Sequence, residues 1–286
     1  MRTSPFSALR SRLEVRRLRE ADRPSTMALL NTEPGASMFL RGNLETLGLR
    51  TDYARYWGLF TNGRLGAVLM MVDQRAAFFA PAGSDIRPLA EVAIGQGMEF
   101  TMGRSDLVDA TLAANPALAV ERREDHILAE LAPGRPRRMV YPAPAGVLVR
   151  QAGRADLEAL TGLYQGAAGF EDLATDQIRR IMTGRISVLR TFLAQAGEHI
   201  VAAASTSAET NQSAMIGGVW TAANWRGRGI STAVVSALAH DLLAAGRLPF
   251  LFYLGDNAPA ARVYAKLGFR SIGQWTVMYF ERRETA

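Results

Sequence analysis

The sequence contains no cysteine, one lysine and three histidines among its 286 residues. Without cysteine there is no disulfide, no thiolate metal site and no covalent cysteine intermediate. The single lysine, Lys266, lies outside any glycine-rich loop, which excludes a Walker phosphate loop. The histidines, His126, His199 and His240, have no ligand spacing among themselves or with carboxylates, so we expect no metal site.

Long apolar runs and concentrated charge are also missing. No run of about 18 apolar residues could span a bilayer, and the first residues lack the apolar core of a secretory signal. We therefore expect a cytoplasmic protein without a membrane partner. The net charge of +6 is spread over both halves of the chain. A nucleic-acid binder would more often gather its basic residues on one stripe, so we expect no nucleic-acid partner.

A glycine-rich segment at residues 224–231, NWRGRGIS, is the most informative part of the sequence. It follows a strand-like run at residues 214–221 and precedes an apolar-periodic helix that ends at Gly246. Gly227 and Gly229 allow backbone conformations and close approaches that a Cβ would forbid. The first helical turn leaves N–H groups free to bind a phosphate. The segment therefore predicts a pyrophosphate-binding loop.

Two other interpretations of this loop stay open at this point. A dinucleotide fingerprint would have glycine or alanine three residues after Gly229, where this chain has Thr232. It also needs an acidic residue after the next strand, and Asp256 could bind a ribose there. The second interpretation is a glycine-rich connection that binds no ligand.

The residues after the loop favour a more specific interpretation. An apolar run at residues 248–254 is typical of a buried strand, and residues 256–259 cap a helix that ends at Gly268. The segments 218–221, 226–229 and 256–269 together resemble the acetyl-CoA-binding half of the GNAT N-acetyltransferase superfamily. The family loop usually begins with Gln or Arg, where this chain has Asn224. That departure affects one side chain, since the family's pyrophosphate contacts are mainly backbone amides.

The resemblance implies a donor site for acetyl-CoA. The residues that would wrap the pyrophosphate are Arg226, Gly227, Arg228, Gly229, Ile230 and Ser231. The backbones of Val219 and Thr221 would pair with the pantetheine arm like an added strand. Asn257 would lie beside pantetheine and Tyr264 near the thioester sulfur, where a phenol could protonate the leaving thiolate. The alternative for Tyr264 is a helix tyrosine that only packs on the sheet.

A general base is not identified by the sequence. An acceptor amine is mostly protonated near neutral pH and must lose a proton before it attacks. Glu171, Asp172, Glu209, His199 and water are the candidates, and each side chain could also be an ordinary surface residue.

The beginning and the middle of the chain resemble each other. Residues 15–22 align with residues 149–156 with four identities, and a strand, an Asp cap and a helix are expected in both. The pattern predicts tandem GNAT-like copies of the α/β (α+β) class, each a mixed, mostly antiparallel sheet flanked by helices. We place them at 1–140 and 145–286. Residues 81–84 lack a second glycine, so we expect the first copy to be degenerate and without coenzyme A.

Other elements are predicted from local patterns. Asn62-Gly63 predicts a type I′ hairpin, residues 175–182 a helix, and residues 270–275 and 277–280 two closing strands.

The leading hypothesis is an acetyl-CoA-dependent N-acyltransferase, monomer or homodimer, that moves an acetyl group directly to an amine. A coenzyme A-binding regulatory or scaffold protein is the alternative, and a nucleotide-binding oxidoreductase is a weaker one. The acceptor is open among a small amine, an amino acid, an antibiotic, a peptide terminus and a protein lysine. We expect its pocket where residues 166–172 approach the first domain.

Overall fold

The computed structural model describes residues 12–132, 140–167 and 169–281. Residues 133–139, just before the boundary predicted at residues 140–145, lie outside the described residues. The chain divides into two compact units, one of Met1–Glu124 with Thr276–Ala286 and one of Asp125–Trp275. No helix in the described ranges is long and apolar enough to cross a membrane.

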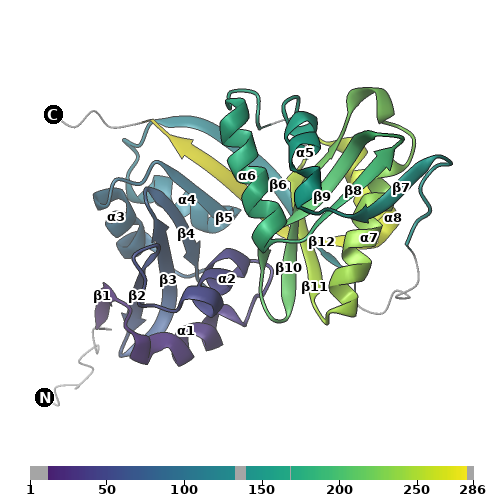
Figure 1. Cartoon of the computed structure of the whole chain (residues 1–286). Coiled ribbons are helices and arrows are strands. Elements are labelled where there is room, and N and C mark those ends of the chain that lie inside the picture. Colours follow the sequence, from purple (N-terminus) through teal and green to yellow (C-terminus); the bar gives the residue numbers. More distant parts are fainter. Residues whose placement is uncertain (1–11, 133–139, 168, 282–286) are drawn as a thin grey trace, which may run out of the picture. The chain divides into compact units, whose positions relative to one another are not determined.

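The first unit holds a mixed sheet with helices on both faces (Figure 1). Its elements are β1 (Leu13–Arg17), η1 (Glu20–Asp22), α1 (Arg23–Leu30), α2 (Met38–Leu47), β2 (Arg55–Thr61), β3 (Arg64–Val72), β4 (Arg75–Phe79), α3 (Arg87–Gly95), β5 (Phe100–Arg104), α4 (Ser105–Ala114) and the start of β6 (Val120–Leu131). Strands β1 to β4 are antiparallel neighbours, and β4 pairs in parallel with β5.

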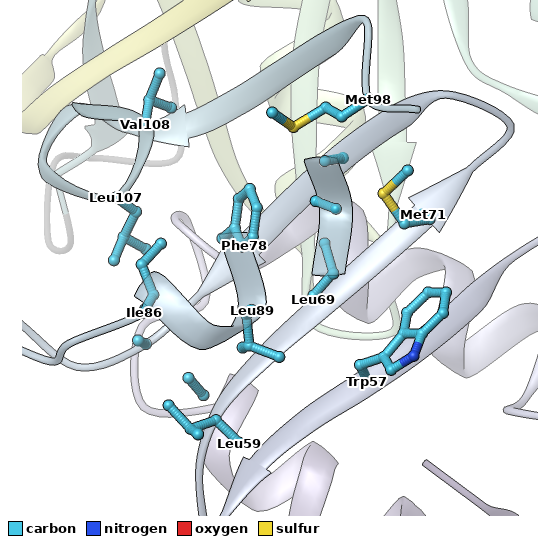
Figure 2. Close-up of a cluster of buried hydrophobic side chains, with 14 of the residues drawn as sticks. Trp57, Leu59, Leu69, Met71, Phe78, Ile86, Leu89, Met98, Leu107 and Val108 are labelled. Carbon is cyan, nitrogen blue, oxygen red and sulfur yellow. The ribbon is translucent and has the colours of Figure 1, made fainter. Parts of the chain in front are cut away.

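Two features position the sheet of the first unit. The β2–β3 turn has Asn62 at φ 51° and Gly63 at φ 80°, the two positive values of a type I′ turn, so that prediction is confirmed. Figure 2 shows the core on one face of the sheet, where the ring of Phe78 lies among Leu69 and Leu107. The side chains of α3 and α4 thus cover β3 and β4.

The second unit repeats this plan. Its elements are β7 (Val147–Gln151), η2 (Arg154–Asp156), α5 (Leu157–Tyr164), α6 (Thr175–Val188), β8 (Thr191–Ala196), β9 (His199–Glu209), β10 (Ser213–Thr221), η3 (Ala223–Trp225), α7 (Ile230–Ala244), β11 (Leu248–Leu254), α8 (Ala258–Leu267) and β12 (Phe269–Phe280). Strands β7 to β10 are antiparallel neighbours, and β10 pairs in parallel with β11. The predicted mixed, mostly antiparallel α/β architecture is confirmed.

Helices cover both faces of the second sheet. Ala202 and Ala204 of β9 belong to the core under α7 and α8, whereas Ala203 belongs to the core under α5 and α6. Successive strand residues point to opposite faces, so the two helix pairs lie on opposite sides of the sheet. Figure 1 shows α5 in front of β9.

The last strand of each half pairs in the other half's sheet. β6, from the first half of the sequence, pairs antiparallel with β11 between His126 and Glu130, and β12 follows β5 in the strand order. The boundaries of the two compact units therefore fall inside β6 and β12.

The prediction of two closing strands is wrong. The structure has one continuous β12, in which Trp275, Thr276 and Val277 are all buried. Buried side chains on consecutive residues leave no place for the surface turn that two strands would need.

Candidate functional site

Strands β10 and β11 diverge in the middle of the second sheet. They pair at four positions, from Ser213 with Leu248 to Ile216 with Leu251. β10 then continues to Thr221 and β11 to Leu254 without further pairing between them in the described structure. A strand edge that leaves its ladder offers backbone N–H and C=O groups to another extended chain. Residues 217–221 form such an edge.

A β-bulge lies at the start of this divergence. The pairing of β10 with β9 shifts register between Gly217 and Trp220, so Gly218 and Val219 are the bulged residues. Gly218 has φ 59°, which favours glycine, and its carbonyl accepts a hydrogen bond from Tyr164 Oη of α5. A bulge bends its strand and re-aims nearby groups. Here it separates the end of β10 from β11.

The glycine loop follows the open edge and leads into α7. Gly227 has φ 75° and Gly229 has φ 79°, and a Cβ on either would meet open space. The helix begins after Gly229 with no side-chain cap and no acidic residue in its first turn. Its first backbone N–H groups are therefore uncapped by side chains at the positive end of the helix dipole. The arrangement suits an anionic ligand.

Two arginines of the loop are held by local contacts. Arg226 Nε donates to the Thr221 carbonyl at 3.1 Å, and its guanidinium lies 4.6 Å from the centre of the Trp220 ring. The Arg228 guanidinium lies 4.9 Å from the ring centre of Trp225. Stacking on an aromatic face orients a guanidinium. Positive charge is thus positioned beside the uncapped helix start.

The helix α8 presents an apolar stripe to the sheet. Its members pack in the core under α7 and α8 and are Ala260, Val263, Tyr264 and Leu267. Asn257 caps this helix, because its Oδ1 accepts from the Ala260 N–H at 3.1 Å. The exposed Asn257 therefore has a structural role of its own.

Tyr264 combines a buried ring with an available hydroxyl. Its ring centre lies 5.2 Å from that of Tyr253 and 6.0 Å from that of Phe269. Within the described residues its hydroxyl makes no hydrogen bond. Burial, with a smaller effect of Tyr253, raises the pKa of the Tyr264 hydroxyl above its usual value. Tyr264 therefore holds its proton at neutral pH, and the raised pKa makes this hydroxyl a weaker acid than that of an exposed tyrosine.

The structure places the four candidate bases in different surroundings. Glu209 lies at the far end of β9 from the loop, where it contacts Arg247 and lies 3.7 Å from Arg190. His199 is exposed at the opposite end of the same strand. Glu171 Oε2 accepts from the Gly169 N–H at 2.6 Å. Asp172, its neighbour in the sequence, is exposed. Glu209 is thereby engaged in an ion network remote from the glycine loop.

The corresponding helix start in the first unit is occupied. Asp85 Oδ1 accepts from the Arg87 N–H at 3.0 Å at the beginning of α3, and its other oxygen pairs with the Arg87 side chain at 2.6 Å. Pro88, in the first turn of α3, has no N–H to donate. A carboxylate and a proline thus stand where the second unit has uncapped amides.

Two residues near the bulge were not found by sequence reasoning. They are Tyr164, whose hydroxyl donates to the Gly218 carbonyl, and Arg185, whose guanidinium lies next to Gly218. The Arg185 guanidinium carbon lies 5.4 Å from the centre of the Tyr164 ring. A signal was present for Arg185, since it continues the buried face of Ile178 and Met182 at helical spacing. An arginine in an apolar stripe is unusual enough to mark a site.

The described residues contain no group of three or more His, Asp or Glu side chains placed to hold a metal ion.

Comparisons with known proteins agree with this geometry. Residues 196–279 match the family model described as FR47-like protein. A GCN5-related N-acetyltransferase from Sphaerobacter thermophilus is similar in structure, with a TM-score of 0.67 and 16% identity over 96% of this chain and 97% of that one. A tandem GNAT protein from the clavulanic acid biosynthesis pathway, solved without acetyl-CoA, has a TM-score of 0.61 and 18% identity over 96% and 100%.

An acetyltransferase of the GNAT family from Colwellia psychrerythraea has a TM-score of 0.57 and 13% identity over 94% of this chain and 100% of that one. No curated protein sequence matches the chain. The chain therefore has the fold of GNAT proteins over nearly its whole length, including that of a tandem GNAT protein. The resemblance inferred from the glycine loop is confirmed at the level of the superfamily fold.

Proposed function

We propose that the protein is an acetyl-CoA-dependent N-acyltransferase whose donor site lies in the second unit. The observation that carries this proposal is the end of the β10–β11 ladder at Ile216, followed by an uncapped helix start after Gly229. Pantetheine is an extended chain with amide groups, and a free strand edge suits it. The pyrophosphate is an anion, and the start of α7 suits that.

The donor contacts follow from this placement. The N–H groups from Gly227 to Ser231 bind the pyrophosphate, and Arg226 and Arg228 add positive charge. Val219 and Thr221 bind pantetheine through their backbone groups. The Thr221 carbonyl already accepts from Arg226, so the N–H groups of this edge are the more available partners. Asn257 keeps its role as the cap of α8 and forms the wall of the donor site.

The transfer itself is direct. The acceptor nitrogen forms a bond to the thioester carbonyl carbon, and the carbon–sulfur bond breaks as the tetrahedral intermediate collapses. The thiolate takes its proton from Tyr264 Oη, which solvent then reprotonates. The amine proton passes to water or a carboxylate. No cysteine is available to carry the acyl group.

The first unit is proposed to be a degenerate copy that binds no coenzyme A. Asp85 places a negative charge at the start of α3, where a pyrophosphate would have to bind.

Thermal unfolding with four nucleotides tests the donor site. Acetyl-CoA and CoA should raise the melting temperature, while NAD and ATP should not. A ligand at a concentration 100 times its dissociation constant adds about 2.7 kcal/mol to the free energy of unfolding, which such a measurement detects. Equal stabilisation by NAD would instead support the dinucleotide interpretation.

Thiol release from acetyl-CoA with a panel of amines tests the chemistry. The protein has no thiol of its own, so the assay has no protein background. If acetyl-CoA stabilised the protein but no amine caused thiol release, the alternative of a regulatory protein that binds coenzyme A would be favoured.

A further inference from the structure

Arg185 is a partly buried cation without a protein counter-charge. Its guanidinium carbon lies 5.4 Å from the ring centre of Tyr164 and 5.5 Å from that of Phe170. Its Nη1 is buried and has no hydrogen-bond partner, and no carboxylate of the described chain pairs with it. By contrast Arg179, on the same helix, bonds both Glu158 and Asp176.

A partly buried guanidinium whose buried Nη1 has no hydrogen-bond partner is energetically unfavourable in the free protein. Buried polar groups nearly always find a partner, and an ionised one costs more to leave unpaired than a neutral one. The two aromatic rings offset part of this cost through their faces, but a ring face does not replace a hydrogen-bond acceptor for the buried Nη1. We therefore expect a ligand to supply the missing hydrogen-bond partner, and the charge of that ligand must be negative.

The position of Arg185 relates this ligand to the proposed reaction. A Cβ placed on Gly218 would lie 2.5 Å from Arg185 Nη1, so the guanidinium rests against the bulge of β10. Gly218 comes two residues after Ile216, where the ladder with β11 ends. The bulge therefore marks the start of the proposed donor edge and is distinct from the glycine loop. The run from Gly218 to Thr221 alone spans about 10 Å, which separates Arg185 from the proposed pyrophosphate.

Arg185 also lies on the acceptor side of the sheet. Trp220 packs in the core under α5 and α6, whereas Val219 packs in the core under α7 and α8. Since α7 carries the pyrophosphate end of the donor, an acceptor must approach the open edge from the face of α5 and α6. Phe170, which contacts Arg185, belongs to the 166–172 loop that the sequence had associated with the acceptor.

We propose that Arg185 binds the carboxylate of the acceptor, and that the acceptors are small amines that carry a carboxylate, such as free amino acids. This inference rests on the proposed N-acyltransferase function and specifies its substrate class. A guanidinium offers parallel N–H groups that match the two oxygens of a carboxylate, and such charge-assisted pairs are the stronger hydrogen bonds in proteins. The same pairing fixes the position of the amine at the other end of the substrate.

Matched pairs of acceptors test the inference. The twenty L-amino acids and their α-amides are compared as acceptors with acetyl-CoA, by thiol release. The free acids should exceed the matched amides about 10- to 100-fold in kcat/KM, the range of a hydrogen bond to a charged group. Arg185→Gln should lower kcat/KM for the acids by a similar factor, mainly by raising KM, and should lower it much less for the amides.

Two further variants serve as controls. Arg180→Gln removes an exposed charge from the same helix and should change neither class of acceptor. Arg185→Lys keeps the charge without the planar fork and should give an intermediate KM for the acids. It also serves as the test variant if Arg185→Gln does not fold.

A binding measurement separates this inference from the proposed function. The melting temperature of the protein saturated with CoA is measured with N-acetyl amino acids and with their amides. Stabilisation by the acids alone, lost in Arg185→Gln, would support the carboxylate site even if no amine were acetylated.

Several outcomes would overturn the inference. The carboxylate site would be contradicted if amides had the same kcat/KM as the matched acids, or if Arg185→Gln lowered kcat/KM equally for both. It would also be contradicted if no acid were acetylated and none raised the melting temperature. A preference for O-phosphoethanolamine over every amino acid would assign Arg185 to a phosphate instead.

Discussion

Arg150 and Asp156 are joined by two hydrogen bonds, from Nη1 to Oδ2 at 2.8 Å and from Nη2 to Oδ1 at 2.7 Å, and Arg16 and Asp22 repeat both distances. In each pair the aspartate Oδ2 also accepts from the backbone N–H three residues before it, at 2.8 Å. The four identities between residues 15–22 and 149–156 include both partners of this pair. The short sequence match therefore corresponds to the same turn, built twice.

Asp22 makes this turn sensitive to acid. The hydrogen bond from Arg16, supported by the Arg19 backbone N–H, lowers the pKa of Asp22 to about 2. An unfolded aspartate has a pKa of about 4, so the ionised form stabilises the fold above about pH 4, and this contribution is lost as pH falls toward 2. The difference in melting temperature between the wild type and Asp22→Asn should accordingly shrink over that window.

Asp52→Asn is the control, because Asp52 is exposed and forms no ion pair among the described residues. Its melting temperature should follow that of the wild type at every pH. A difference for Asp22→Asn that does not change between pH 5 and pH 2 would contradict the ionised pair.

The donor half could be predicted from the sequence because its signals are local. The glycine loop, the caps of α8 and the apolar stripe that contains Tyr264 each depend on residues within one or two turns of each other. The structure places all of them as expected, from α7 ending before Gly246 to α8 ending at Gly268. What these residues bind stays a prediction.

Non-local features could not be predicted. The exchange of β6 and β12 depends on partners more than a hundred residues away, and no local pattern distinguishes the two sheets. The helix α2 was not predicted, because Gly42 and Asn43 interrupt its apolar period. Arg185 was overlooked because its significance comes from the absence of a partner, which only the fold reveals.

The two glycines of the loop should be required for the donor and not for the fold. Gly227→Ala and Gly229→Ala place a Cβ in open space at positive φ, so each should cost roughly 1–2 kcal/mol of stability through strain alone. Relaxing that strain moves the loop N–H groups. The dissociation constant for CoA, measured by calorimetry, should rise roughly tenfold or more.

Gly63→Ala provides a matched control in the β2–β3 turn. Gly63 has φ 80° and equally open surroundings, so the loss of melting temperature should be similar while CoA affinity stays unchanged. If all three variants bound CoA like the wild type, the loop would not be the pyrophosphate site.

Each chain should bind a single CoA. The start of α7 is uncapped, whereas the start of α3 carries Asp85 and Pro88. Titration calorimetry should give one site per chain, and Asp85→Asn should leave both the stoichiometry and the affinity unchanged. Two sites in the wild type would show that the first unit is not degenerate.

Tyr264 decides whether the donor site also performs the chemistry. Its ring packs against Tyr253 and Phe269, and its hydroxyl has no partner in the described structure, so Tyr264→Phe keeps the packing and removes only the proton donor. Because burial raises the pKa of this hydroxyl, the wild type holds its proton throughout the neutral range. Turnover should fall by roughly 10²- to 10⁴-fold in the variant, while the dissociation constant for acetyl-CoA changes little.

Tyr141→Phe is the control. It removes a hydroxyl that donates to the Lys266 carbonyl at the end of the same helix, and it should keep full turnover. Unchanged turnover in Tyr264→Phe, with the chemical step shown to be rate-limiting, would leave Tyr264 as a packing residue and assign the proton to water.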